Sequence, residues 1–232
     1  MNEEIILNCK VVLLGETSVG KTSLISRYVN NTFETNSLTT TGASYAYKTI
    51  HLKQYNKSIK FEIWDTAGQE RYRSLTKIFY KNASVAILCY DITKKGSFNE
   101  IKNYWFNQVK NNSPNDIVIA IAANKSDLYE IEEVNEEEAR NYAKSVGAIF
   151  IATSAMNSSG IEDLFKAVGS KFIDPNYCFE DDCGDDKKDC DKQNNDENND
   201  NKTQKEDDYK KNNFKLEKDN KNDKRKKKKK CC

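Results

Sequence analysis

The segment Gly15-Glu16-Thr17-Ser18-Val19-Gly20-Lys21-Thr22 matches the glycine-rich pattern of a phosphate-binding loop. It follows an apolar stretch that predicts a strand and precedes a periodic stretch that predicts a helix, which is the context the pattern requires. There, backbone N–H groups and the helix N-terminus attract an anion, the Lys21 ammonium reaches the outer phosphates, and the Thr22 hydroxyl binds Mg²⁺. We therefore expect a nucleoside triphosphate to bind Gly15, Ser18, Val19, Gly20, Lys21, Thr22 and Ser23.

A second motif, Asn124-Lys125-Ser126-Asp127, follows another apolar stretch that predicts a strand. The carboxyl ends of parallel strands meet at one edge of a sheet, so we expect this motif beside the phosphate-binding loop. A carboxylate at Asp127 can accept both N–H donors on the edge of guanine, whereas adenine presents an incompatible pattern. Because the wrong base would leave a buried acceptor unpaired, Asn124, Lys125 and Asp127 are expected to select guanine.

Short apolar stretches alternate with amphipathic stretches as far as Asp174. Strands are expected at residues 5–14, 45–52, 59–64, 85–90, 117–123 and 148–152, and helices at residues 21–29, 71–79, 98–109, 136–146 and 161–173. A short polar loop joins the second strand to the third, which indicates a hairpin. The expected fold class is α/β, with a six-stranded, mostly parallel, doubly wound sheet and one antiparallel edge strand.

The composition changes after Pro175, where Asn, Asp and Lys dominate and aliphatic residues are scarce. Such a segment cannot bury enough apolar surface to offset the entropy of ordering it. We therefore expect one domain over residues 1–174 and a disordered tail over residues 175–232. The net charge of +1 hides a division of the tail, since residues 180–200 hold ten acids against three bases and residues 201–232 hold fourteen bases against six acids.

Further motifs resemble a known family. The segment Trp64-Asp65-Thr66-Ala67-Gly68-Gln69-Glu70-Arg71-Tyr72 resembles the second switch of Rab proteins, a family within the Ras superfamily, and the resemblance extends over residues 7–173. Arg73-Ser74-Leu75, Tyr90-Asp91-Ile92-Thr93 and Ser97-Phe98 are most similar to the early-endosomal Rab branch. The resemblance implies the P-loop GTPase fold and a GTP hydrolase that acts as a switch.

The resemblance also implies roles for individual residues. Asp65 and Thr40 would complete the Mg²⁺ site with Thr22, while Gln69 would orient the attacking water and the Gly68 N–H would contact the γ-phosphate. The guanine would be bound by Phe33, Ser154, Ala155 and Met156. The aromatic triad presented to effector proteins would be Tyr45, Trp64 and Phe79, for which ordinary core packing is the alternative.

Two positions depart from the family pattern. Met156 stands where the family usually has Lys, and we expect modestly weaker nucleotide affinity because its side chain can still cover the base. Thr41 stands where the family has Ile, a residue that offers an apolar contact to partner proteins. We therefore expect this position to affect the choice of partners more than the chemistry.

Seven consecutive basic residues, Lys224 to Lys230, precede the terminal pair Cys231-Cys232. The pair resembles the substrate of Rab geranylgeranylation, and lipid together with a basic run would hold the chain on an anionic membrane. A solvated face or a nuclear signal is the alternative for the lysines. A metal site at Cys178, Cys183 and Cys190 is a further alternative.

Other features limit the class of protein. Cys9 and Cys89 lie in apolar stretches and are expected to be buried, and the seven cysteines show no disulfide-like spacing, which favours a reducing cytosol. No apolar run approaches the roughly 20 residues of a membrane span. The acidic start does not resemble a signal peptide or a myristoylation signal. Membrane contact is therefore expected from the cytosolic side, through the C-terminus.

The sequence thus predicts a Rab-type GTPase that cycles between GDP and GTP, with Mg²⁺, on the cytoplasmic face of endosomal membranes and in a soluble cytosolic pool. Hydrolysis is expected to be slow without an activating protein that supplies an arginine. Other expected partners are an exchange factor, effectors, the Rab escort protein and the GDP-dissociation inhibitor, and no nucleic acid. Two alternatives stay open: a non-hydrolysing adaptor, and a signalling GTPase of the Ras or Rho branch.

Overall fold

The structure is a computed structural model, which describes residues 6–35, 40, 42–66 and 79–179. Its strands are β1 (Ile6–Leu14), β2 (Ser44–Leu52), β3 (Lys57–Asp65), β4 (Val85–Asp91), β5 (Val118–Asn124) and β6 (Ile149–Thr153). They form one six-stranded sheet in the order β2-β3-β1-β4-β5-β6. Only β2 is antiparallel to its neighbour, so the expected edge hairpin and the mostly parallel sheet are confirmed.

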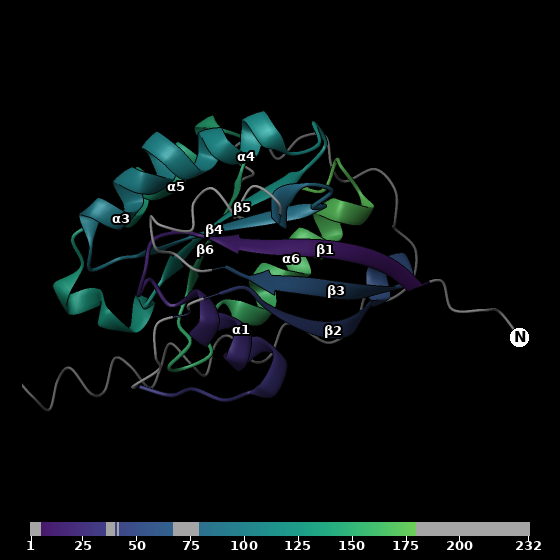
Figure 1. The fold of residues 1–232 in the computed structure, drawn as a ribbon, viewed down its shortest axis with the longest axis horizontal. Coiled ribbons are helices and arrows are strands. Elements are labelled where there is room, and N and C mark those ends of the chain that lie inside the picture. The colour runs from purple at the N-terminus through teal and green to yellow at the C-terminus, as the bar shows by residue number, and fades with distance from the viewer. Residues whose placement is uncertain (1–5, 36–39, 41, 67–78, 180–232) are drawn as a thin grey trace, which may run out of the picture. The chain divides into compact units, whose positions relative to one another are not determined.

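Helices cover both faces of this sheet (Figure 1). On one face lie α1 (Lys21–Asn30) and α6 (Ile161–Ile173), and on the other lie α3 (Lys95–Glu100), α4 (Phe106–Asn112) and α5 (Glu136–Ser145). Alternation along β1 explains the two cores, because Val11 and Leu13 pack against the α1 and α6 side while Val12 and Leu14 pack against the other. The fourth strand, β4, is buried at every position, as expected of a central parallel strand.

The strand order reverses at β1, because β3 lies on one side of it and β4 on the other. In doubly wound sheets, ligands bind at this reversal of strand order, beyond the strands' carboxyl ends. The loops after β1, β4, β5 and β6 therefore meet at a single edge, which the sequence motifs also occupy.

One expected helix differs in detail. The sequence predicted a continuous helix over residues 98–109, whereas the structure has α3 and α4 joined by a π-helical turn at Ile101–Trp105. The turn lies where Ile101 and Trp105 are both fully buried, which lets the large indole face the core. Of the helix expected at residues 71–79, only the end at Phe79 lies within the described residues.

The described chain continues past α6 onto the body of the domain. Tyr177 and Phe179, which the sequence analysis assigned to the tail, pack against the core beside α1 and α6. The remainder of that tail, residues 180–232, lies outside the described residues. Within the described part of the chain, no helix is both long enough and apolar enough to cross a bilayer. The buried positions of Cys9 and Cys89 agree with the expectation from their apolar surroundings.

The turn before α6 requires glycine at position 160. Gly160 has a φ of +67°, and a Cβ at this position would lie 2.0 Å from the carbonyl oxygen of Ala152. Gly147 offers a matched control, because its φ is +69° and nothing lies within 4 Å of the corresponding Cβ. Backbone strain is therefore common to both positions, whereas the clash with β6 is confined to Gly160.

We predict that Gly160→Ala destabilises the domain much more than Gly147→Ala. Left-handed backbone strain costs Gly147→Ala about 1–2 kcal/mol, and Gly160→Ala adds displacement of β6 or of the turn. Thermal unfolding of both variants measures the difference, at about 2–4 °C of melting temperature per kcal/mol for a chain of this size. Equal losses in the two variants would contradict the clash.

Candidate functional site

A cleft of about 470 Å³ opens at the edge where the loops after β1, β5 and β6 meet. Residues of both sequence motifs share this one lining. The lining residues are Thr17, Ser18, Gly20, Lys21, Thr22, Ser23, Phe33, Glu34, Thr35, Thr40, Thr66, Asn124, Lys125, Asp127, Leu128, Ala155 and Met156. Its size and its mixture of polar and apolar groups suit a small polar ligand such as a nucleotide.

The loop between β1 and α1 wraps tightly against the end of β5. Gly20 has a φ of +95°, and a Cβ there would lie 2.4 Å from the Asn124 side-chain nitrogen. Glycine at this position therefore permits both the left-handed backbone and the close approach of the second motif. The loop then leads directly into α1, whose ten residues begin at Lys21 and present free N–H groups toward the cleft.

The only ammonium group deep in the cleft wall, among the described residues, is that of Lys21, whose side chain is 5% exposed. Its Nζ donates hydrogen bonds to the carbonyl oxygens of Gly15 and Glu16, both at 2.9 Å. Burial lowers the pKa of Lys21, and the nearby Asp65 carboxylate opposes this effect. A positive group in such a place of low polarity attracts an anion more strongly than a lysine in water would.

Three oxygen-bearing side chains cluster beside Lys21. The Thr22 hydroxyl donates to Asp65 Oδ2 at 2.6 Å, and the Thr40 hydroxyl lies 2.7 Å from that of Thr22. The other carboxylate oxygen, Asp65 Oδ1, is buried and has no hydrogen-bond partner among the described residues. Burial raises the pKa of Asp65, while the Thr22 hydroxyl and the Lys21 charge lower it. Hard oxygen donors with one buried, unsatisfied carboxylate oxygen are the donor set that Mg²⁺ takes.

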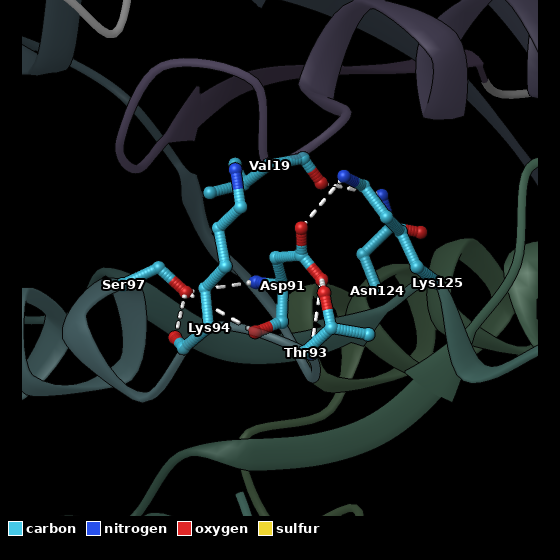
Figure 2. A network of polar contacts seen from close by, with 7 residues as sticks. All are labelled: Val19, Asp91, Thr93, Lys94, Ser97, Asn124 and Lys125. Carbon is cyan, nitrogen blue, oxygen red and sulfur yellow. Dashed lines mark hydrogen bonds and ion pairs between the residues drawn. The ribbon is translucent and has the colours of Figure 1, made fainter. Parts of the chain in front are cut away.

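The buried side chain of Asn124 joins three loops. Its Nδ2 donates to the Val19 carbonyl oxygen at 2.8 Å, as Figure 2 shows, and its Oδ1 accepts from the Thr153 hydroxyl at 3.2 Å. Each such bond stabilises the fold by about 1 kcal/mol, and a buried amide left without partners costs about 1–3 kcal/mol. Asn124 thus fixes the two motifs relative to each other and to the end of β6.

Asp91, at the end of β4, forms a second polar network around Lys125 (Figure 2). The Asp91 side chain is fully buried and pairs with Lys125 Nζ at 2.6 Å. It also accepts hydrogen bonds from the Thr93 backbone N–H at 3.0 Å and hydroxyl at 2.7 Å. Lys125 has a left-handed backbone with a φ of +64°, which is strained for a residue other than glycine. Its ion pair with Asp91 holds the side chain in place in spite of this strain.

The loop after β6 completes the cleft wall. The Ser154 hydroxyl donates to the Asp127 carboxylate, and the backbone N–H of Met156 donates to that hydroxyl at 3.2 Å. Phe33, Ala155 and Met156 line the cleft around Asp127, and Met156 is 60% exposed at its rim. A carboxylate beside an aromatic ring and a thioether chain forms a slot that suits a planar base bearing N–H donors.

Outside the cleft, three aromatic rings form a row from β2 to β3 and on to residue 79. The ring of Trp64 lies 5.3 Å from that of Tyr45 and 5.5 Å from that of Phe79, measured between centroids. Tyr45 is 48% exposed, Trp64 and Phe79 are partly exposed, and Phe79 also packs against one of the two cores. The Lys10 ammonium lies 5.6 Å from the Trp64 ring centre.

The structure brings together most residues that the sequence singled out. Four of them do not line the cleft, but each bonds to a residue that does. Gly15 bonds to Lys21, Val19 to Asn124, Asp65 to Thr22, and Ser154 to Asp127. Gly68, Gln69, Thr41, Cys231 and Cys232 lie outside the described residues.

Sequence reasoning missed several contributors to the site. Asp91 gives a detectable signal, because it is a polar residue at the end of an apolar strand, as Asn124 is. Thr66 donates its hydroxyl to the Leu13 carbonyl oxygen at 2.6 Å and fixes the residue after β3 to the end of β1. Arg27 gives no comparable signal, because its spacing is that of any residue on a helix.

The chain matches the sequence pattern of the Ras family over residues 10–174. It is 47% identical over 156 residues to the Ras-related protein Rab-22A of Homo sapiens, which covers 67% of this chain and 79% of the relative. It is 45% identical over 169 residues to Rab-31 of Homo sapiens (72% and 85%), and 40% identical over 159 residues to RGP2 of Oryza sativa subsp. japonica (68% and 72%).

These similarities confirm the resemblance stated from the motifs. The chain therefore belongs to the Ras family and is a small GTPase of the Rab type.

Proposed function

We propose that the cleft is the guanine-nucleotide site of this GTPase, with the roles of its residues as follows. A Rab-type GTPase hydrolyses GTP with water to GDP and phosphate and acts in membrane traffic. The observation that carries the proposal is the convergence of Lys21, Thr22 and Asp127 on one cleft, with Asp65 bonded to Thr22. Lys21 and the N-terminus of α1 bind the phosphates, while Asp127, Phe33 and the loop at 154–156 bind the base.

Mg²⁺ fits the oxygen cluster formed by Thr22, Thr40 and Asp65. The buried, unsatisfied Oδ1 of Asp65 supports this assignment, because an oxygen of that kind acquires a partner when a cation binds. When bound, Mg²⁺ neutralises charge that develops on the phosphate oxygens. The protein's own part is to orient Thr22, which the Asp65 carboxylate fixes at 2.6 Å.

Base recognition depends on the charge of Asp127. In Asp127→Asn, an amide nitrogen replaces one acceptor oxygen, and we predict a shift in preference from guanine to xanthine, whose edge offers the complementary group. The affinity for GDP should fall by roughly a hundredfold or more, since hydrogen bonds to charged groups contribute about 1.5–3 kcal/mol each. Asp116→Asn, an exposed carboxylate outside the cleft lining, is the matched control.

Equilibrium binding of GDP and of xanthosine diphosphate to both variants measures this shift. Wild-type affinity for GDP in Asp127→Asn, with no gain for the xanthine nucleotide, would show that another group selects the base.

Gln69 is proposed to orient the attacking water, by resemblance to the family, and its position lies outside the described residues. Gln69→Leu should retain GTP binding and lower hydrolysis at least about tenfold with an activating protein present, equivalent to about 1.4 kcal/mol of barrier. Gln54→Leu, an exposed residue in the β2–β3 hairpin, is the matched control. Single-turnover hydrolysis of GTP measures both. Unchanged hydrolysis in Gln69→Leu would place water positioning elsewhere.

The aromatic row Tyr45, Trp64 and Phe79 is proposed as the effector surface. Two observations support it: all three rings are partly exposed, and the Trp64 ring contacts the other two.

The other proposed partners are an exchange factor, an activating protein, the Rab escort protein and the GDP-dissociation inhibitor. The domain is proposed to comprise residues 1–174 and the tail residues 175–232, of which Tyr177 and Phe179 pack against the domain. The proposed location is the cytoplasmic face of endosomal membranes, which the motif resemblance and the similarity to Rab-22A and Rab-31 support.

Cys231 and Cys232 are proposed to carry geranylgeranyl groups next to the basic run Lys224–Lys230. Lipid insertion is nearly indifferent to salt, whereas basic residues are screened within about 10 Å at 0.1 M salt. Replacing both cysteines by Ser should therefore leave the protein in the cytosol or bound weakly and released by salt. Replacing five of the lysines by Gln should keep it on membranes but move it away from the most anionic ones.

Membrane fractionation at low and at high salt measures both effects, with the double variant Cys183→Ser and Cys190→Ser as the matched control. Retention at high salt of the variant that lacks Cys231 and Cys232 would rule out the prenyl anchor.

A further inference from the structure

The guanidinium of Arg27, in the last turn of α1, binds two segments of the cleft that are distant in sequence. Its Nε donates to the Ala155 carbonyl oxygen at 2.8 Å, and one Nη donates to the Met156 carbonyl oxygen at 3.2 Å. The other Nη donates to the backbone and side-chain oxygens of Asn31, at 3.0 and 3.2 Å. All four acceptors are uncharged oxygens, so these bonds fix the positions of the acceptor groups and form no ion pair.

These bonds act on the wall of the slot proposed for the base. Ala155 and Met156 line the cleft, and their carbonyl groups define the planes of the peptides between 155 and 157. The same loop also bonds to Ser154, whose hydroxyl accepts from the N–H groups of Met156 and Asn157. The loop is therefore fixed from two sides: Ser154 from within, and Arg27 from α1.

Arg27 also reaches the aromatic side of the slot. Its guanidinium carbon lies 6.0 Å from the centre of the Phe33 ring, within the range of a cation–π contact. Asn31, which it binds, ends α1 with a left-handed backbone and begins the segment that leads to Phe33. One side chain thus connects the phosphate-binding helix, the ring of Phe33 and the loop at 154–157.

We propose that Arg27 is a positioning residue for base recognition: it holds the loop at 154–157 so that this loop contacts the oxygen on the six-membered ring of the base, and it holds Phe33 over that base. The inference rests on the proposed guanine site. Arg27 does not contact the nucleotide itself but acts through Ala155, Met156 and Phe33.

The planar fork of arginine is essential to this role. Three separate oxygen-bearing groups lie around one guanidinium, whereas a lysine ammonium at the end of a flexible stem can reach one of them at a time. Lysine nevertheless retains the positive charge at the C-terminal end of α1, where a cation stabilises the helix dipole. Arg27→Lys therefore separates positioning of the loop from stabilisation of the helix.

The test compares Arg27→Lys and Arg27→Gln with Arg140→Gln in the full-length protein. Arg140 is the matched control, because it is an arginine on the other face of the sheet that pairs with Glu136 and packs over Phe150, outside the cleft lining. The ligands are GDP and 6-thioguanosine diphosphate, which keeps both N–H donors read by Asp127 but has sulfur, a weak hydrogen-bond acceptor, in place of the ring oxygen. Equilibrium affinity, dissociation rate and melting temperature are measured for each.

Arg27→Gln is expected to lower the affinity for GDP about tenfold, mostly through faster dissociation, while the affinity for the oxygen-free analogue falls less, because there only the contact of Phe33 with the base is weakened. Discrimination between the two ligands should therefore fall. Arg27→Lys should lose discrimination at nearly wild-type melting temperature, and Arg140→Gln should leave discrimination unchanged.

Equal losses for both ligands, or a lower melting temperature with intact discrimination, would overturn the proposal and leave Arg27 a structural residue only. Failure of the underlying guanine site looks different. In that case the wild-type protein itself would bind GDP and the oxygen-free analogue equally, before any substitution is made.

Discussion

The buried amide of Asn124 sets the distance between the loop that follows β1 and the loop that follows β5. It bonds to Val19 on one side and to Thr153 on the other, so the first motif and the ends of two strands are held by a single side chain. The close approach that this requires accounts for glycine at position 20, since any side chain there would meet the amide. The two loops that carry the sequence motifs therefore share one structural reference.

Near Asn124, several charged side chains of the site are buried away from water. Lys21, Asp65 and Asp91 are nearly or fully buried, which is costly for ions unless each has partners. Asp91 has them in Lys125 and Thr93, and Lys21 has them in two backbone carbonyl groups. Asp65 is satisfied on one oxygen alone by the described residues. The two buried carboxylates therefore differ: the described residues satisfy Asp91, whereas Asp65 keeps one oxygen without a partner among them.

Local patterns in the sequence were sufficient to predict the sheet, its edge hairpin and the two motifs at its carboxyl edge. Period-two and period-3.6 patterns report on burial, and burial determines where strands and helices lie. The π-helical turn at Ile101–Trp105 escaped prediction, because the packing of Trp105 against the core overrides a helical pattern that looks regular.

Other features escaped because they are contacts between distant parts of the chain. No spacing rule joins Arg27 to Ala155 or Lys125 to Asp91; those pairs follow from how the helices and strands are stacked. The row of Tyr45, Trp64 and Phe79 was left open between surface and core, because aromatic residues occur in both. Its exposure follows from the position of β2 at the edge of the sheet, which leaves one side of Tyr45 uncovered.

The course of α6 has a mechanical consequence. The helix begins beside the cleft at Gly160 and ends at the opposite edge of the sheet, where Gln54 of the β2–β3 hairpin bonds to Ser170. A pull on the chain beyond Phe179 would be borne first by the packing of Phe179 and Tyr177 and by the bond from Lys171 to the Tyr177 carbonyl oxygen. Force would thus enter the domain at the end remote from the nucleotide loops. The first contacts to yield under load would be those at the end of α6, with the cleft left intact.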